Sequence, residues 1–148
     1  MMRVKPGFRL FINNHNLVHR GEAIVFRPNT DNEYFSTDQG GFRHSVFRGE
    51  TLTLLDIVRR ERYGLVLGSS HIFGIGTAGN ENSLPSLLGE RFGFPFANVS
   101  RPEGNSRNLF SQLFAVIDRY MLVHCAGMTP AEALDQVGHY HSSRVIPL

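Results

Sequence analysis

The sequence has little of several features that define whole classes of protein. It holds a single cysteine, Cys125, in 148 residues, so no internal disulfide can form and a reducing cytoplasm is the expected location. No apolar run approaches the roughly 20 residues that span a bilayer. The first eleven residues carry Arg3, Lys5 and Arg9 but no continuous apolar core, so we expect no signal peptide. These absences predict a cytoplasmic protein without a membrane partner.

Charge of one sign is also scarce. The formal net charge is +2, with 19% charged and 41% hydrophobic residues, which is typical of one soluble globular domain. The one basic cluster, Arg59-Arg60-Glu61-Arg62, lies where a helix is expected to end, and positive charge there favours the helix dipole. Basic residues are not interleaved with aromatic ones, as they are where single-stranded bases stack. We therefore expect no nucleic-acid partner.

Residues 1–50 are predicted to form an extension of loops and short strands. Ala23–Phe26 is a short apolar run of the kind found in strands. Residues 31–43 are polar and rich in turn formers. From Thr51 to Arg62 apolar residues recur at helical spacing, and Gly64 is placed to end the predicted helix.

Residues 51–148 are predicted to form an α/β domain. Short buried strands are expected at Leu65–Leu67 and Pro95–Val99, with a helix over Ser83–Phe92 between them. Further helices are expected from Asn105 or Ser106 to about Met121, and from Thr129 to Gly138. Two buried strands joined through a helix favour parallel pairing with a right-handed crossover. The prediction is a small three-layer domain with a short parallel sheet.

The loops that follow the two strands hold the candidate chemistry, because ligands bind beyond the carboxyl ends of parallel strands. Gly68, Ser70 and Gly74 follow the first strand, and Asn98 and Gly104 lie at and beyond the end of the second. We expect the two loops to face each other. On these residues the sequence resembles the SGNH (GDSL-type) hydrolases, through that family's first two sequence blocks. The resemblance extends over residues 35–110, including the helix entry before Leu87 and the segment Phe35–Arg43.

The resemblance implies a serine esterase, acyl-hydrolase or acyltransferase that needs no cofactor and no metal. Its substrate would be a small-molecule or glycan acyl ester. Ser70 aligns with the nucleophile, and the N–H groups of Ser70 and Gly104 would stabilise an oxyanion. The substrate would be bound by the neighbouring residues Ser69, His71, Asn98 and Asn105.

The sequence departs from the family in the residues that activate the serine. The third block, Gly-x-Asn-Asp, and the fifth, Asp-x-x-His, are absent, and Ser69 stands where the family has an acidic residue. Three residues separate Asp135 from His139, whereas the fifth block has two between its aspartate and its histidine. His139 and His71 are nevertheless candidate bases. The expectation is a shortened member of the family or the N-terminal part of a longer protein.

Three other interpretations remain. The domain could be a catalytically incomplete binding or interaction module, or could complete its sheet with a second copy or another chain. Gly74–Gly79 spells the dinucleotide fingerprint Gly-x-Gly-x-x-Gly, but it begins well after the strand end, so nucleotide binding is less favoured. The pairs His15/His19, placed in a turn, and His139/His141 lack further ligands, so no metal site is predicted.

Overall fold

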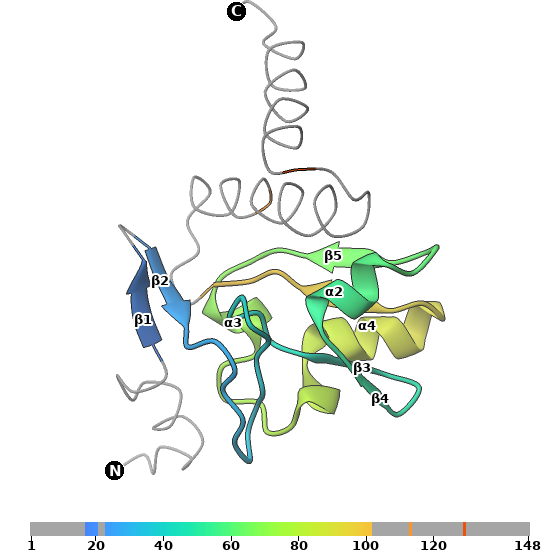
Figure 1. Cartoon of the computed structure of the whole chain (residues 1–148). Coiled ribbons are helices and arrows are strands. Elements are labelled where there is room, and N and C mark those ends of the chain that lie inside the picture. Colours follow the sequence, from blue (N-terminus) through green and yellow to red (C-terminus); the bar gives the residue numbers. More distant parts are fainter. Residues whose placement is uncertain (1–16, 21–22, 102–112, 114–128, 130–148) are drawn as a thin grey trace, which may run out of the picture.

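The computed structural model describes residues 17–20, 23–101, 113 and 129. Its strands are β1 (Leu17–Arg20), β2 (Ala23–Phe26), β3 (Ser45–Phe47), β4 (Glu50–Leu52), β5 (Gly64–Val66) and β6 (Phe96–Asn98). Its helical elements are α2 (Leu54–Val58), α3 (Ser70–Phe73), the 3-10 turn η2 (Asn80–Asn82) and α4 (Leu84–Phe92) (Figure 1). The described part is a mixed α/β fold with a short parallel sheet, as predicted.

The parallel sheet consists of β5 and β6. Gly64 pairs with Phe96 and Val66 with Asn98, so both strands end at the same edge. The chain passes between them through α3, η2 and α4, since parallel strands need a crossover connection. Parallel pairing through a helix was predicted from the sequence, and it is confirmed.

Helix α4 ends at Phe92, as the sequence predicted, and begins at Leu84, one residue after the predicted start. Ser83 is its N-cap and Gly93 its C-cap, with φ 77 at the glycine. Such a left-handed residue commonly ends a helix, and glycine adopts it without steric cost. The helix buries its small residues Pro85, Ser86 and Gly89. Gly89 has little room to spare, because a Cβ there would lie 3.3 Å from the ring of Phe47.

Two antiparallel hairpins precede the sheet. Strands β1 and β2 pair with Leu17 opposite Phe26, and β3 and β4 pair with Ser45 opposite Leu52. The second hairpin turns at Arg48 and Gly49, which have φ 52 and φ 79, and positive φ at both turn residues suits a two-residue hairpin. The predicted strand at Ala23–Phe26 is confirmed, whereas the hairpin around residue 50 was missed. The expected domain boundary at that residue lies inside it.

The predicted helix over Thr51–Arg62 is wrong in its extent. The observed helix α2 covers Leu54–Val58 alone, because Thr51 and Leu52 belong to β4. Thr53 begins the helix through a capping box: its hydroxyl accepts from the N–H of Asp56, whose carboxylate accepts from the N–H of Thr53. Gly64, expected to end the helix, is the first residue of β5 instead.

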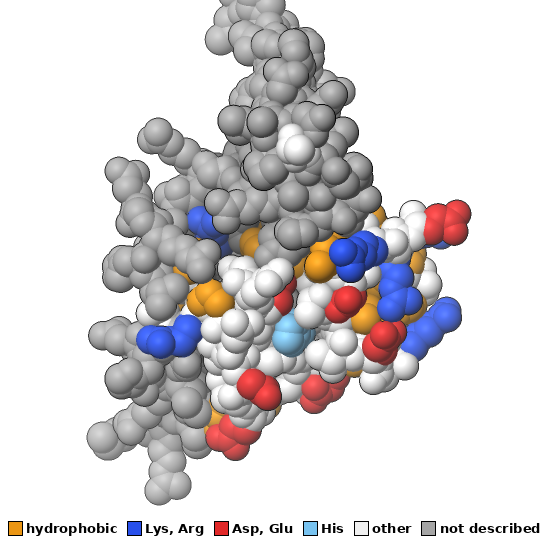
Figure 2. All heavy atoms as spheres, viewed as in Figure 1, with side chains coloured by type: hydrophobic (Ala, Val, Ile, Leu, Met, Phe, Trp, Pro, Cys, Tyr) orange, Lys and Arg blue, Asp and Glu red, His pale blue; other side chains and the backbone are white. Residues whose placement is uncertain are grey.

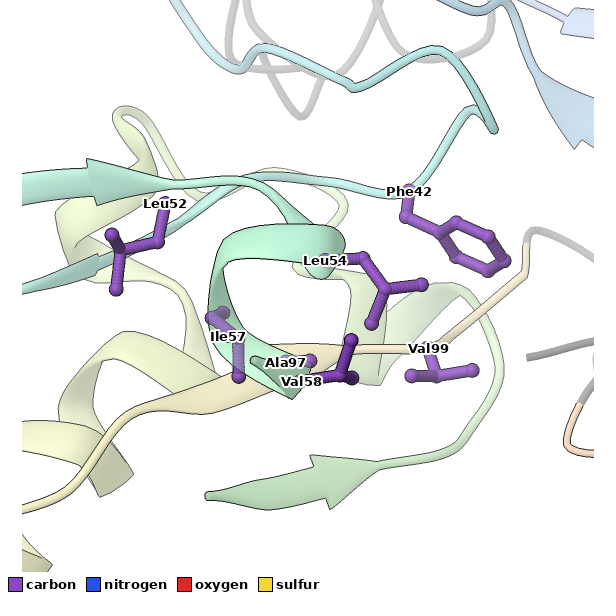
Figure 3. Packing of buried hydrophobic residues seen from close by; sticks show 7 residues of the cluster. All are labelled: Phe42, Leu52, Leu54, Ile57, Val58, Ala97 and Val99. Atoms are coloured by element: carbon purple, nitrogen blue, oxygen red, sulfur yellow. The ribbon is translucent and has the colours of Figure 1, made fainter. Parts of the chain in front are cut away.

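The main core lies between α2 and β6, and Figure 3 shows its side chains meeting there. Its buried members come from the segment before β3, from β4, from α2 and from β6 with the residue after it. They are Phe42, Leu52, Leu54, Ile57, Val58, Ala97 and Val99. Burying each large member contributes about 1.5–3 kcal/mol. Because Phe42 and Leu52 share one cluster, the described part of the N-terminal extension and the α/β unit have a common core.

A second, aromatic cluster fixes α3. Phe26 stacks on Phe73 with ring centroids 3.7 Å apart, and Phe35 meets Phe73 edge to face at 5.6 Å. All three rings are buried. The last residue of α3 is therefore anchored to β2 and to the loop that follows it.

Candidate functional site

Ser70 is the first residue of α3, immediately beyond the end of β5. Strand β5 ends at Val66, and Ser69 is the N-cap of the helix with φ −85 and ψ −165. Gly68 allows this sharp turn, because a Cβ there would collide with the side chain of Ile72. Ser70 is half-buried in this turn.

The residues directly after β6, 99–101, lie beside this turn. The N–H of Val99 donates to the carbonyl of Val66 at 2.9 Å, and the N–H of Arg101 donates to the carbonyl of Gly68 at 3.1 Å. These bonds extend the contact between the two segments past the end of the sheet. Arg101 is therefore held next to Gly68, two residues before Ser70.

The start of α3 has free backbone donors. Ser69 caps the helix by position, but its hydroxyl makes no capping hydrogen bond. The first N–H groups of a helix have no acceptor within the helix itself. Within residues 23–101 no bond from the N–H of Ser70 or of His71 is present. The turn therefore retains N–H groups that could stabilise negative charge.

The hydroxyl of Ser70 has no hydrogen-bond partner among the described residues. His71, one of the two candidate bases, is exposed and follows Ser70 on α3. Within residues 23–101 no histidine or carboxylate is hydrogen-bonded to this hydroxyl. Three predicted site residues, Gly104, Asn105 and His139, lie outside the described residues. Of the helices expected after residue 104, only Leu113, which is helical, and Thr129 are described.

Asn98 connects β6 to α3. It is 1% exposed, and its amide donates to the carbonyls of Ile72 and Phe73 at 3.4 and 3.2 Å. Its side-chain oxygen accepts from the N–H of Ser100 at 3.3 Å. The role that the structure gives Asn98 is to hold α3 against the sheet. Substrate contact by Asn98 and by the half-buried Ser69 stays a prediction.

The glycine-rich loop after α3 is not built as a phosphate cradle. It follows a helix instead of a strand, and several of its amides already have acceptors. The N–H of Thr77 donates to the carbonyl of Gly74, and the N–H of Gly79 to that of Tyr34. A dinucleotide fingerprint instead presents its N–H groups to the pyrophosphate directly after the strand. The loop therefore lacks the strand-end position of that fingerprint.

Arg43 organises this loop, and sequence analysis missed it. The side chain is 1% exposed, and its guanidinium donates to backbone carbonyls of the loop. Burial lowers the pKa of Arg43 to about 10, so it stays charged at neutral pH. Its neighbours in the chain, Phe42 and His44, give no signal of this role, because these partners lie thirty or more residues further on.

A second polar network lies next to Arg43. The hydroxyl of Ser36 is 2.7 Å from Nδ1 of His44, and the amide of Asn80 donates to that hydroxyl at 2.7 Å. The oxygen of the same amide accepts from Nε of Arg43 at 3.1 Å. Burial lowers the pKa of His44. This network joins the polar segment before the hairpin to the end of the glycine-rich loop.

Asp38 organises the turn that precedes Arg43. It is 6% exposed, and one carboxylate oxygen accepts from the N–H groups of Gly40 and Phe42 at 2.8 and 3.0 Å. Burial raises the pKa of Asp38 despite these bonds. A cavity of about 380 Å³ opens beside this turn, lined by Asn29, Thr37, Asp38, Gln39, His44, Thr53 and Leu55. None of its lining residues belongs to the Ser70 turn.

The described residues show neither a basic patch for nucleic acid, on the face seen in Figure 2, nor a cluster of metal ligands. Basic and acidic side chains are interspersed on the face seen in Figure 2. In the basic cluster Arg60 pairs with Glu50 at 3.0 Å, and Arg62 lies over the ring of Phe94. Across the described residues no three His, Cys, Asp or Glu side chains gather as a metal would require. His19, expected in a turn, lies in β1.

No helix in the described ranges is both long enough and apolar enough to cross a membrane. No family model matches the chain, and no curated protein matches it either.

Proposed function

We propose that the chain is a serine hydrolase of the SGNH type, acting as an esterase, acyl-hydrolase or acyltransferase through Ser70. The observation that carries the proposal is the place of this serine. It opens a helix shortly beyond β5, and the N–H of Arg101, after β6, donates to the carbonyl of Gly68 in the turn that leads to it. In parallel α/β sheets such a strand-end position is where ligands bind.

The reaction would proceed by acyl transfer through the serine. Oγ of Ser70 attacks the acyl carbon while its proton passes to a base, and the carbonyl oxygen becomes an oxyanion. The N–H groups of Ser70 and Gly104 donate to that oxyanion. The bond to the leaving group then breaks, and water or a second alcohol releases the acyl group from Ser70. The chemistry needs neither cofactor nor metal, and His139 remains the candidate base.

A fluorophosphonate probe tests this proposal, because it reacts with serines that a base has activated. The full chain should be labelled at Ser70, and Ser70→Ala should abolish labelling. Thr51→Ala is the control, since it removes an exposed hydroxyl of β4 that belongs to no part of the proposed site, and it should still be labelled. Wild type and the control variant should also hydrolyse short acyl esters, and Ser70→Ala should not. An unlabelled wild-type chain that cleaves no ester would refute the hydrolase.

The second candidate is an SGNH-like binding or interaction module without catalysis. It is favoured by one observation: within residues 23–101 nothing accepts the proton of Ser70. The module would complete its sheet with a second copy or another chain, because the two strands in the described residues, β5 and β6, would alone be a marginal sheet. Absence of labelling together with a concentration-dependent rise in mass by light scattering would favour it over the enzyme.

A further inference from the structure

The guanidinium of Arg43 binds the end of α3 and the loop that follows it. Nη1 donates to the carbonyls of Phe73 and Gly74 at 3.0 and 2.9 Å. Nη2 donates to the carbonyl of Gly79 at 2.7 Å and to that of Tyr34 at 3.1 Å. A single side chain thus joins both ends of the loop to the segment before β3.

The charge of Arg43 suits this place. The last carbonyls of a helix lack partners within the helix and carry partial negative charge, which a cation stabilises. Cζ of Arg43 also lies 5.6 Å from the ring centroid of Phe73 and 5.9 Å from that of Phe35. The guanidinium therefore holds both the backbone and the ring of the last residue of α3.

Ser70 lies one helical turn from these bonds. Its carbonyl accepts from the N–H groups of Gly74 and Ile75 at 3.2 and 3.0 Å. A helix of four residues is too short to be stable alone, so contacts from outside set its position. Among these contacts, Arg43 acts on the carbonyl of Gly74, whose own N–H bonds to Ser70.

We propose that Arg43 is a positioning residue for Ser70, which it orients by clamping the end of α3 and the Gly74–Gly79 loop. The inference rests on the proposed function, in which Ser70 is the nucleophile. Reactivity of a positioned group falls steeply when it is misplaced by about 1 Å. Lysine cannot substitute, because one ammonium offers three donors from a single point, whereas the guanidinium offers five in a planar fork.

The test measures the rate at which a fluorophosphonate labels Ser70, at a temperature where circular dichroism shows every variant to be folded. Arg43→Lys should be labelled about tenfold to a hundredfold more slowly than wild type. The control is Val58→Ala or Leu52→Ala, whichever lowers the melting temperature by about as much as Arg43→Lys does. Both remove buried side chains from the core cluster, and neither should slow labelling more than about twofold.

Two further measurements keep the test decisive if Arg43→Lys fails to fold. Thr77→Val removes an oxygen that accepts from Nη1 at 3.2 Å and donates to the carbonyl of Gly74, and it should slow labelling severalfold. In Arg43→Ala, guanidinium below its denaturing range should restore part of the rate, which it should not do in the core controls.

The outcomes separate this inference from the function on which it rests. A wild-type chain that is not labelled overturns both. If wild type is labelled and folded Arg43→Lys and Thr77→Val react at the same rate, the positioning role alone is wrong. It is equally wrong if the core controls lose as much reactivity as the Arg43 variants.

Discussion

Asn98 and Phe73 are joined by a hydrogen bond that crosses from the sheet to the helix bearing Ser70. The amide of Asn98, at the end of β6, donates to the carbonyl of Phe73, at the end of α3, over 3.2 Å. Both residues are buried, at 1% and 0% exposure. The bond fixes the distance between the two strand-end segments that make up the candidate site.

Replacing Asn98 should therefore destabilise the fold. Asn98→Leu leaves the carbonyl of Phe73 without this donor, and we expect it to lose about 1–3 kcal/mol of unfolding free energy in urea titrations. Asn98→Asp should lose more at neutral pH, because a buried carboxylate would face carbonyl oxygens. Its pKa would be raised in the folded state, so its stability should recover as the pH falls toward 4. Equal stability of all three proteins would contradict the structural role of this amide.

His44 should make stability depend on pH on the acid side of neutral. Burial lowers its pKa, and this effect exceeds the opposing influence of Asp38, Asp31 and Asp56. A histidine with a lowered folded pKa contributes stability that is present above its unfolded pKa of about 6.5 and is lost as the pH falls through the folded value. The free energy of unfolding should therefore decline below about pH 6.5.

The control for this decline is His44→Asn. Its side-chain amide occupies the place of Nδ1 and retains the contact with the hydroxyl of Ser36, but it does not titrate. The difference in unfolding free energy between wild type and variant should shrink as the pH is lowered from 7 to 5. Parallel pH profiles for the two proteins would show that His44 does not carry the effect.

Two glycines with nearly the same backbone angle offer a matched pair. Gly41 has φ 82 and Gly49 has φ 79. A Cβ at Gly49 meets nothing within 4 Å, whereas one at Gly41 collides with the carbonyl oxygen of Phe26. Gly49→Ala should lose about 1 kcal/mol from backbone strain alone, and Gly41→Ala clearly more. Urea midpoints of the two variants measure the difference, and equal midpoints would disprove the collision.

The capping box of α2 should make the free energy of unfolding fall in acid, as Asp56 becomes protonated. Hydrogen bonds from Thr53, together with Arg59 and Arg60, lower the pKa of Asp56 below its usual value even though partial burial opposes them. Stability from a lowered carboxyl pKa is present above the unfolded value of about 3.9 and is lost as the pH falls through the folded one.

Thr53→Ala should cost about 1 kcal/mol at neutral pH. The cost should diminish in acid, where Asp56 becomes protonated in both proteins. Thr51→Ala, which changes an exposed threonine of β4, is the control and should have little effect. A cost for Thr53→Ala that is independent of pH would mean that the carboxylate does not share in the cap.

The parts of the fold that the sequence predicted have strong local signals. Helix α4 has a serine before it, a proline in its first turn and a glycine after it, and all three hold their expected places. The strand pair β5–β6 was predicted from short apolar runs on either side of that helix. The place of Ser70 followed from these two results.

The parts that were missed depend on contacts distant in the sequence. The hairpin β3–β4 has strands of three residues, too short for a period to be recognised, and it took Thr51 and Leu52 from the predicted helix. Arg43 was not singled out, because nothing near it in the chain reveals the carbonyls of Phe73 and Gly79 that hold it. Burial of a charged group is decided by tertiary structure.

The parallel pairing of β5 and β6 has a consequence for the order of folding. Gly64 pairs with Phe96, thirty-two positions along the chain, whereas Phe47 pairs with Glu50, three positions along. Closing the longer loop loses more chain entropy before any stabilising contact forms. Such distant pairings therefore slow folding. We expect the β3–β4 hairpin to acquire hydrogen-exchange protection early in refolding. The Ser70 turn, which exists only once both strands are in register, should be protected last.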